Sequence, residues 1–180
     1  MSKSPDFPTS TTLRQNYQRL FQFDLWTIRS LILLMEREEN FADRIACLAF
    51  LSHIVTIQEM WFNRVLTIPV IEVDDPWAEY SPEELRIRAK EVNRKWMDLI
   101  ADEEIDLNTM LSIPREDGSK RSMTVREVLD HLLVHGQYHR AQIALFLKKS
   151  GIDSPGFDYI SYTRSFPDAG LLSWDSGVNP

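Results

Sequence analysis

The chain has only one cysteine among its 180 residues, Cys47, and this scarcity excludes several kinds of protein. One thiol cannot form an internal disulfide or supply a cysteine-rich zinc site, and a lack of disulfides is typical of cytoplasmic proteins. The sequence also lacks a run of about 18 uncharged apolar residues, as a membrane span requires, and residues 1–10 have no apolar signal core. We therefore expect a cytoplasmic protein that does not enter a membrane.

Clusters of positive charge are also missing. The net charge is −7, and the basic residues form no stripe that would neutralise a row of phosphates. No segment has the Lys/Arg-rich polar face of a helix that lies on a membrane surface. We therefore expect neither nucleic-acid binding nor membrane-surface binding. The length fits a single domain over residues 1–180, with an ordered part at about 12–168 and flexible termini.

Apolar residues recur at three- and four-residue spacing in four long segments, which predicts four helices. These segments span residues 13–38, 40–66, 81–100 and 124–150. Residues 106–122, around Asp117 and Gly118, predict a short hairpin or an irregular loop. The aromatic segment 155–160 is expected to dock as a turn or short helix, and residues 173–180 to be frayed. Four helices with such connections predict an all-α four-helix bundle.

Helix start and stop signals mark most of these boundaries. Asn40 is a good N-cap for the second helix. Residues 81–84, Ser-Pro-Glu-Glu, supply an N-cap, a proline at the first helical position and a capping-box glutamate for the third helix. Thr124 and Glu127 predict the same capping box for the fourth helix, and Gly151 suits the position just after its end.

Three of the four histidines lie on the fourth predicted helix, as His131, His135 and His139. Side chains at i and i+4 lie one turn apart on the same face, so either neighbouring pair can hold one metal ion. At about 100° per residue, His139 lies about 40° from the core direction of the hydrophobic stripe, His135 about 80° and His131 about 120°. The helical phase therefore favours His139 and His135 over His131 as inward-facing residues.

A durable site needs a third ligand from another helix, because a catalytic zinc-like centre typically has three protein ligands and an open position. His53 is the one histidine outside the fourth helix, and it lies on a packed side of the second. Gly136 would let a neighbouring helix approach closely and help His53 to reach the same ion. The alternative is that these histidines are hydrogen-bonded core residues, which is the commoner role for a single histidine.

Several polar residues are candidates to support such a site, because a ligating imidazole generally donates its other N–H to a carboxylate, amide or carbonyl. Asp24 is the first candidate, since a carboxylate inside an apolar stripe must find a partner. Gln142 is the second, with a glutamine at the rim of the site as the alternative. Glu59 and Arg64 fit either substrate binding or an ion pair at the bundle edge, which is the commoner role.

Arg140, Cys47 and the apolar surface of the second predicted helix also bear on the site and on assembly. Arg140 fits a structural hydrogen-bond anchor, which we favour, or a contact with an anion. Cys47 is not expected to act as a nucleophile, because it lies on a different side of the second helix from His53. That helix is apolar almost all the way round, which predicts either a dimer interface or a central helix packed on several sides.

The run HLLVHGQYHRAQIALFL, residues 131–147, resembles the H-x-x-x-H-x-x-x-H-R-x-Q signature in the last helix of the DinB/YfiT-like family of proposed metalloenzymes. Residues 53–64 are similar to the pattern H-x-x-x-x-x-E-x-W-x-x-R of the family's second helix, and residues 23–26 to Y-N-x-W of its first. One departure is Ala141, where the family often has glycine. This departure puts local packing in question more than ligation.

The resemblance implies an up-down-down-up four-helix bundle, commonly a homodimer, with a hairpin or loop between the third and fourth helices. It also implies a divalent transition metal on His53, His135 and His139, with His131 left out. Zinc, nickel and iron are the candidate metals, since imidazole suits all of them. Such an ion keeps nearly its full double charge on three neutral imidazoles, so it lowers the pKa of a bound water or thiol.

The family resemblance implies two kinds of activity on a small-molecule substrate. One is a low-molecular-weight-thiol S-transferase, in which the thiol comes from solution because Cys47 is not expected to take part. The other is a hydrolase. The alternative from a different class is a noncatalytic metal-binding or scaffolding helical bundle.

Overall fold

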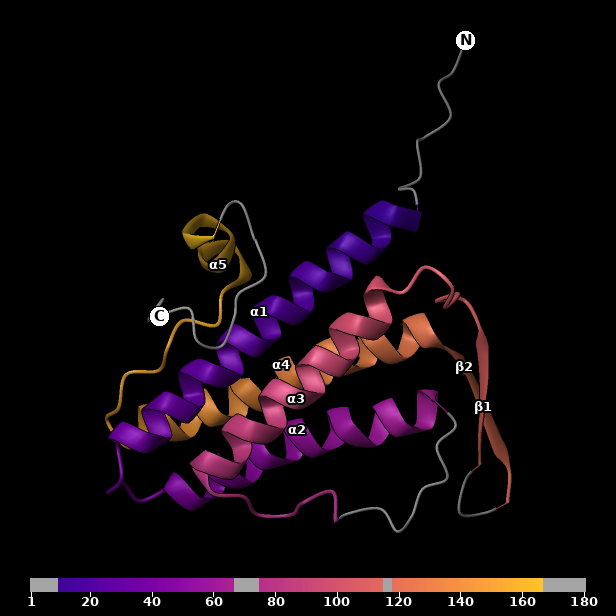
Figure 1. Ribbon diagram of the computed structural model, residues 1–180. Coiled ribbons are helices and arrows are strands. Elements are labelled where there is room, and N and C mark those ends of the chain that lie inside the picture. The colour runs from indigo at the N-terminus through magenta and orange to yellow at the C-terminus, as the bar shows by residue number, and fades with distance from the viewer. Residues whose placement is uncertain (1–9, 67–74, 115–117, 167–180) are drawn as a thin grey trace.

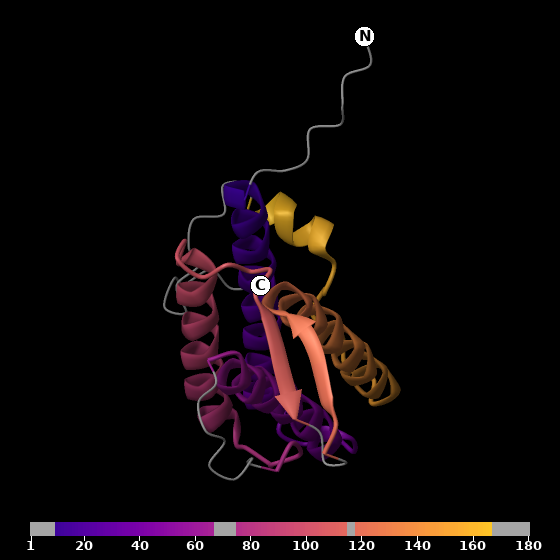
Figure 2. The same ribbon diagram turned by 90° about the vertical axis from the view of Figure 1, so that its right-hand side faces the viewer.

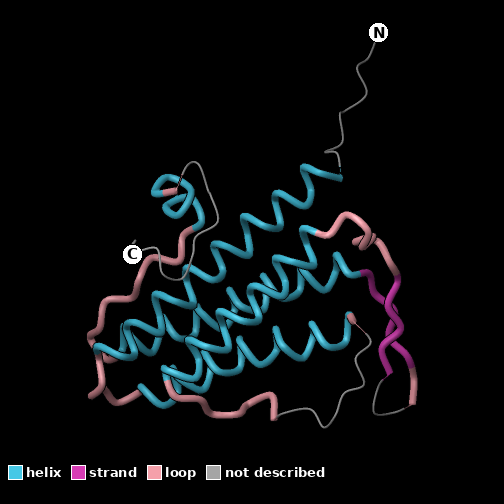
Figure 3. The backbone as a smooth tube through the Cα atoms, viewed as in Figure 1, coloured by secondary structure: helices cyan, strands magenta, loops and turns pink. Residues whose placement is uncertain are grey.

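Helices make up most of the described chain, with one hairpin among them. The structure is a computed structural model that describes residues 10–66, 75–114 and 118–166. The elements are α1 (Ser10–Arg37), α2 (Arg44–Val65), α3 (Pro82–Ala101), β1 (Met110–Pro114), β2 (Lys120–Thr124), α4 (Val125–Lys149) and α5 (Tyr159–Ser165) (Figures 1 and 3). The predicted order of four long helices, with a hairpin before the fourth, is confirmed. The segment 173–180, expected to be frayed, lies outside the described residues.

Capping boxes start α3 and α4 as the sequence predicts. The Ser81 hydroxyl accepts the Glu84 backbone N–H, and the Glu84 carboxylate accepts the Ser81 backbone N–H at 2.8 Å. Thr124 and Glu127 make the same pair of bonds at the start of α4. Gly151, just after α4, has a φ of 74°, the left-handed conformation that glycine adopts without strain.

The predicted start of the second helix was wrong. Asn40 is not its N-cap, because α2 begins at Arg44 and the N-cap is Asp43, which makes no side-chain capping bond. The Arg44 guanidinium instead donates to the backbone carbonyls of Met35, in the last turn of α1, and Glu38, just after it. This link between α1 and α2 holds residues 41–43 in a turn, so α2 begins later than the sequence predicts.

Contacts near the helix ends give the direction of each long helix. Arg44 at the start of α2 bonds to Met35 near the end of α1, and Arg86 in the first turns of α3 pairs with Glu36. Both α2 and α3 therefore run opposite to α1. The phenol of Tyr17, near the start of α1, donates to Asp130 in the first turns of α4, so α4 runs in the same direction as α1.

The core lies between the four long helices, and Trp96 of α3 is its largest fully buried side chain. Its indole packs against Phe21 of α1 at 5.9 Å between ring centroids and against Phe62 of α2 at 5.2 Å. The indole N–H donates to the backbone carbonyl of Gln58 at 3.2 Å, so burial leaves this polar group paired. One aromatic side chain thus joins three helices.

The hairpin crosses one end of the helices, as the turned view shows (Figure 2). Its strands are antiparallel, and Leu111 faces Met123 in the register. Both side chains are buried in the core, so the hairpin covers the ends of the helices with one apolar face. Gly118 has a φ of 80°, which suits the turn between the strands.

The predicted turn or short helix near residue 158 is the helix α5. Asp158 caps it by accepting the backbone N–H groups of Ile160 and Ser161. Tyr162 is fully buried, and its ring packs against Phe23 of α1 at 5.4 Å between centroids. The aromatic residues of this segment therefore attach α5 to α1.

Most of the apolar surface of α2 is used inside the fold. The helix is long and apolar enough to cross a membrane by length and composition alone, but half of its most apolar 18-residue window is buried in the protein. Leu51, Ile54 and Val55 are each at most 1% exposed, and the helix packs against both α3 and α4. These contacts are those of a core helix, and they support the interpretation of α2 as a central helix packed on several sides.

Candidate metal centre

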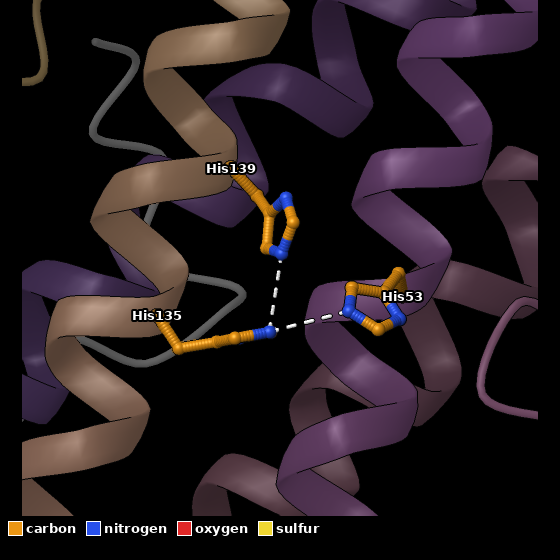
Figure 4. A group of neighbouring side chains, drawn as sticks. All are labelled: His53, His135 and His139. Carbon is orange, nitrogen blue, oxygen red and sulfur yellow. Dashed lines mark hydrogen bonds between the residues drawn. The ribbon is translucent and has the colours of Figure 1, made fainter.

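Histidines on facing surfaces of α2 and α4 point toward one another (Figure 4). His53 comes from α2, and His135 and His139 come from successive turns of α4. The Nε2 atom of His135 lies 3.2 Å from Nε2 of His53 and 3.1 Å from Nε2 of His139. The three candidate ligand atoms all lie within 4.8 Å of one another. The structure thus brings together the three histidines that the sequence singled out.

The spacing of these nitrogens suits a small metal ion. Two nitrogens bound to a tetrahedral zinc ion at about 2.0–2.1 Å are about 3.3 Å apart, which is close to the two short Nε2 separations of His135. The candidate ligand atoms of His53 and His139 lie within 4.8 Å of each other, so only a modest closing movement would bring them to the same spacing. The donor set therefore fits a metal ion with three protein ligands and a position open to another molecule.

Outer hydrogen bonds fix the direction of two of the imidazoles. The Nδ1 atom of His53 lies 2.7 Å from the backbone carbonyl of Pro76, which can only accept, so Nδ1 carries the proton. The Nδ1 atom of His139 lies 2.7 Å from Oε1 of Gln142 and donates in the same way. In both rings the proton on Nδ1 leaves the lone pair of Nε2 directed at the site, as metal ligation requires.

Two of the three histidines, His135 and His139, have lowered pKa values, which favours the neutral form that binds metal. Burial, with the neighbouring His139 and His53, lowers the pKa of His135 from 6.5 to about 3. Burial also lowers the pKa of His139, although the bond to Gln142 acts in the opposite direction. Protons therefore compete weakly for these two imidazoles at neutral pH.

His131 is not one of the converging histidines, as its helical phase predicts, although its ring contacts that of His135 at 5.5 Å between centroids. It is exposed on α4, and its ring contacts Trp61 at 5.6 Å between centroids in an edge-on arrangement. It is not among the three histidines whose ligand atoms converge. The structure therefore agrees with leaving His131 out of the ligand set.

Aromatic side chains pack against two of the three histidines, His53 and His139. Trp77 lies parallel to His53, with centroids 3.9 Å apart and 5° between the ring planes. Phe50 stacks on His139 at 5.4 Å. Neither ring was a candidate from the sequence: Trp77 lies in a loop, and Phe50 is one apolar residue among many on α2. Only the three-dimensional arrangement distinguishes them from ordinary packing residues.

The prediction that Asp24 supports a ligating histidine needs a correction. One oxygen of Asp24 accepts from the Arg140 guanidinium, and the other accepts from the Gln58 amide at 2.7 Å. Among the described residues, none of the histidines donates to this carboxylate. The sequence was right that a buried acid must find a partner, but the partner is a buried arginine. Arg140 is 1% exposed, which confirms it as a structural anchor.

The expectation for Gly136 also changes. A side-chain carbon at this position would lie 3.0 Å from Arg140 Nη1 and 3.1 Å from Asp24 Oδ1. Glycine therefore leaves space for the buried ion pair between α4 and α1, and it does not serve the approach of α2. The signal for this role was absent from the sequence, because nothing there indicates which helix faces Gly136.

The remaining candidates have mainly structural contacts. Glu59 pairs with Arg88 of α3, and the guanidinium of Arg64 lies 5.0 Å from the centre of the Trp61 ring. The first contact confirms the ion-pair interpretation of Glu59. Cys47 is 1% exposed, and burial raises the pKa of its thiol to about 11. The thiol is therefore protonated and inaccessible, in agreement with the sequence analysis.

Comparison with known proteins identifies a family. The sequence model of the DinB family matches residues 36–169, well over half of the chain. This region contains all four histidines of the chain, including the three that converge. No curated protein and no solved structure matches the chain.

The buried ion pair leads to the first prediction. Asp24→Ala leaves the charge of Arg140 buried without its partner, and we expect a loss of about 3–5 kcal/mol in the free energy of unfolding. Asp98→Ala is the matched control, because Asp98 pairs with Arg94 on the surface of α3, where both side chains are 65% exposed. The control should lose no more than about 0.5 kcal/mol. Urea unfolding measures both, and equal losses would contradict the structural role of Asp24.

The low pKa of His135 gives the second prediction, for the metal-free protein. The unfolded chain takes up a proton near pH 6.5, whereas the folded chain does so near pH 3, so the unfolded chain binds more protons between these values. The contribution of His135 to stability is therefore complete above pH 6.5 and decreases as the pH falls. Chelator-treated wild type should lose stability more steeply than His135→Gln as the pH is lowered to about 5 in urea unfolding. If the stability of wild type and of His135→Gln falls equally as the pH is lowered, His135 does not make this contribution.

Proposed function

Because the chain belongs to the DinB family, we propose that it is a metal-dependent enzyme with one divalent transition metal ion on His53, His135 and His139. The observation that carries the proposal is the convergence of the three imidazoles, whose ligand atoms lie within 4.8 Å of one another. Zinc, nickel and iron all accept imidazole ligands and are the candidate metals. The hydrogen bonds that fix the tautomers of His53 and His139 support the same assignment.

We further propose that the four long helices form the up-down-down-up bundle of the family, as a single domain over residues 1–180. The helix directions support this topology, since α1 and α4 run one way and α2 and α3 the other. The contacts of α2 with both α3 and α4 place the second helix between them, which is where His53 must lie to meet the histidines of α4.

We propose a small-molecule thiol as the nucleophile. A bound ion would lower the pKa of a thiol or water from solution. The thiol must come from outside, because Cys47 is buried and the pKa of its thiol is raised to about 11. His53 and His139 donate to a backbone carbonyl and a side-chain amide, so neither of these two bonds involves a carboxylate. We favour a low-molecular-weight-thiol S-transferase, in which the ion would hold the thiolate, with a hydrolase that uses metal-bound water as the alternative.

An apolar stripe on α4 supports a homodimer. Val134, Tyr138 and Leu145 share one side of the helix and are 71%, 62% and 67% exposed. The apolar residues of α2 are mostly used inside the fold, so the stripe on α4 is the better candidate surface for a second copy. We therefore propose a cytoplasmic homodimer that meets through α4 and acts on a small molecule.

The metal content of matched variants is the third prediction. Protein purified without a histidine tag and reconstituted with zinc, nickel or iron should hold one ion per chain by elemental analysis. His139→Ala should lose the ion, because two imidazoles rarely make a durable site. His131→Ala is the control, since it removes a histidine from the same helix that lies outside the cluster, and it should keep the ion. Absence of metal from the reconstituted wild type would overturn the proposed site.

Turnover of the metal-loaded protein gives the fourth prediction. We expect thiol-dependent consumption of small electrophiles by the wild type and none by His139→Ala, measured by loss of free thiol across a panel of low-molecular-weight thiols. Ester hydrolysis that does not depend on thiol would favour the hydrolase instead. A metal-loaded protein without turnover in either panel would contradict both activities and favour the noncatalytic metal-binding or scaffolding bundle.

A further inference from the structure

Trp77 lies flat on a candidate metal ligand although it is not a core residue. Its indole is parallel to the His53 ring, with 3.9 Å between centroids and 5° between planes. Trp77 is 47% exposed, so about half of its surface remains in contact with water. The preceding residue contacts the same histidine, because the backbone carbonyl of Pro76 accepts the proton of His53 Nδ1 at 2.7 Å. Two consecutive residues thus hold one imidazole from its face and from its edge.

The segment that carries these residues is itself held in place. Asp75 accepts the backbone N–H of Trp77 at 2.9 Å through its side chain and that of Ala78 at 2.8 Å through its carbonyl, which closes a turn. Further along, the backbone N–H of Tyr80 donates to the hydroxyl of Ser52 at 3.2 Å. Ser52 is fully buried and immediately precedes His53. The turn is therefore fixed to α2 beside the histidine that it contacts.

Phe50 extends these ring contacts to a second ligand. It meets Trp77 edge-on at 5.7 Å between centroids and stacks on His139 at 5.4 Å with 27° between planes. The indole of Trp77 also lies edge-on to His139, at 6.1 Å. A continuous set of aromatic contacts thus joins the loop after α2 to ligands on both helices.

We propose that Trp77 is a positioning residue of the metal centre, and that with the Pro76 carbonyl it sets the ring plane and tautomer of His53; this inference rests on the proposed function. The terminal torsion of a histidine is broad, so an unsupported imidazole samples many ring orientations. The indole face restricts the ring to one plane, and the Nδ1–H bond to Pro76 directs the Nε2 lone pair into the site. Trp77 therefore reduces the ordering that metal binding would otherwise require of His53.

The affinity of the wild type and of Trp77 variants for zinc is the fifth prediction. Loss of an outer partner of a metal ligand typically weakens binding about 10- to 100-fold, and we expect this for Trp77→Ala in competition with a chromophoric chelator. Trp77→Phe keeps a planar ring and should recover most of the affinity, whereas Trp77→Leu keeps apolar bulk without a ring and should not. Trp61→Ala is the matched control, because the ring contact of Trp61 is with His131 and not with one of the three converging histidines. Its zinc affinity should equal that of the wild type.

The visible spectrum of the cobalt-loaded protein distinguishes a positioning role of Trp77 from a general effect on stability. Cobalt absorbs in the visible range according to its ligand geometry, so the cobalt-loaded Trp77→Ala protein should have altered bands, and Trp77→Phe should have those of the wild type. Urea unfolding of the metal-free variants checks that they fold. If Trp77→Ala does not fold, the comparison of the leucine and phenylalanine variants decides the question, since equal affinities and spectra in those two would overturn a role for ring stacking.

The outcomes distinguish this inference from the proposed function. A wild type that binds neither zinc nor cobalt would overturn the metal site itself, and the role of Trp77 with it. A wild type that binds zinc tightly, with a folded Trp77→Ala variant of equal affinity and identical cobalt spectrum, would overturn only the positioning role. Weaker binding together with an altered spectrum in Trp77→Ala, and recovery in Trp77→Phe, would support both.

Discussion

The buried carboxylate of Asp24 joins three of the four long helices. Asp24 belongs to α1, and it accepts from Arg140 of α4 and from Gln58 of α2. An unpaired charge in this position would cost several kcal/mol, so α1 and α4 must pack in the rotation that brings the carboxylate and guanidinium together. His139 immediately precedes Arg140 and lies about 100° away around the helix. When Arg140 points to α1, His139 consequently points to α2, where His53 lies.

The same ion pair affects the chemistry that the site can support. Arg140 and Gln58 satisfy both oxygens of Asp24, so this carboxylate is not available to the histidines. A metal ion on three neutral imidazoles keeps its double charge, whereas a carboxylate ligand would cancel part of it. The remaining charge is what lowers the pKa of a bound thiol or water. The pairing that orients α4 therefore also preserves the acidity that the proposed reaction requires.

The sequence predicted the features that follow from periodicity or from local chemistry. The phase of the α4 histidines is set by 3.6 residues per turn, and the capping boxes of α3 and α4 involve neighbours in sequence, so both were predicted correctly. The partner of Asp24 was not predicted, because a buried acid requires a partner without indicating which helix supplies it. Asn40 failed as an N-cap because the side chain of Arg44 bonds to α1 across space. Trp77 was missed because loop residues have no periodicity that indicates what they contact.

The two helices that supply the candidate ligands differ in how much support each histidine needs. His135 and His139 are separated by one turn of α4, so the helix itself fixes their relative position, and the outer partner of His139 is Gln142, three residues along the same helix. His53 has no second ligand on α2, so its position depends on how α2 packs and how its ring is turned. The bond between Gln58 and Asp24 helps to fix how α2 packs. The helix itself cannot fix how the His53 ring is turned. This asymmetry explains why the stacking ring and the carbonyl acceptor are found together at His53, in the loop after α2.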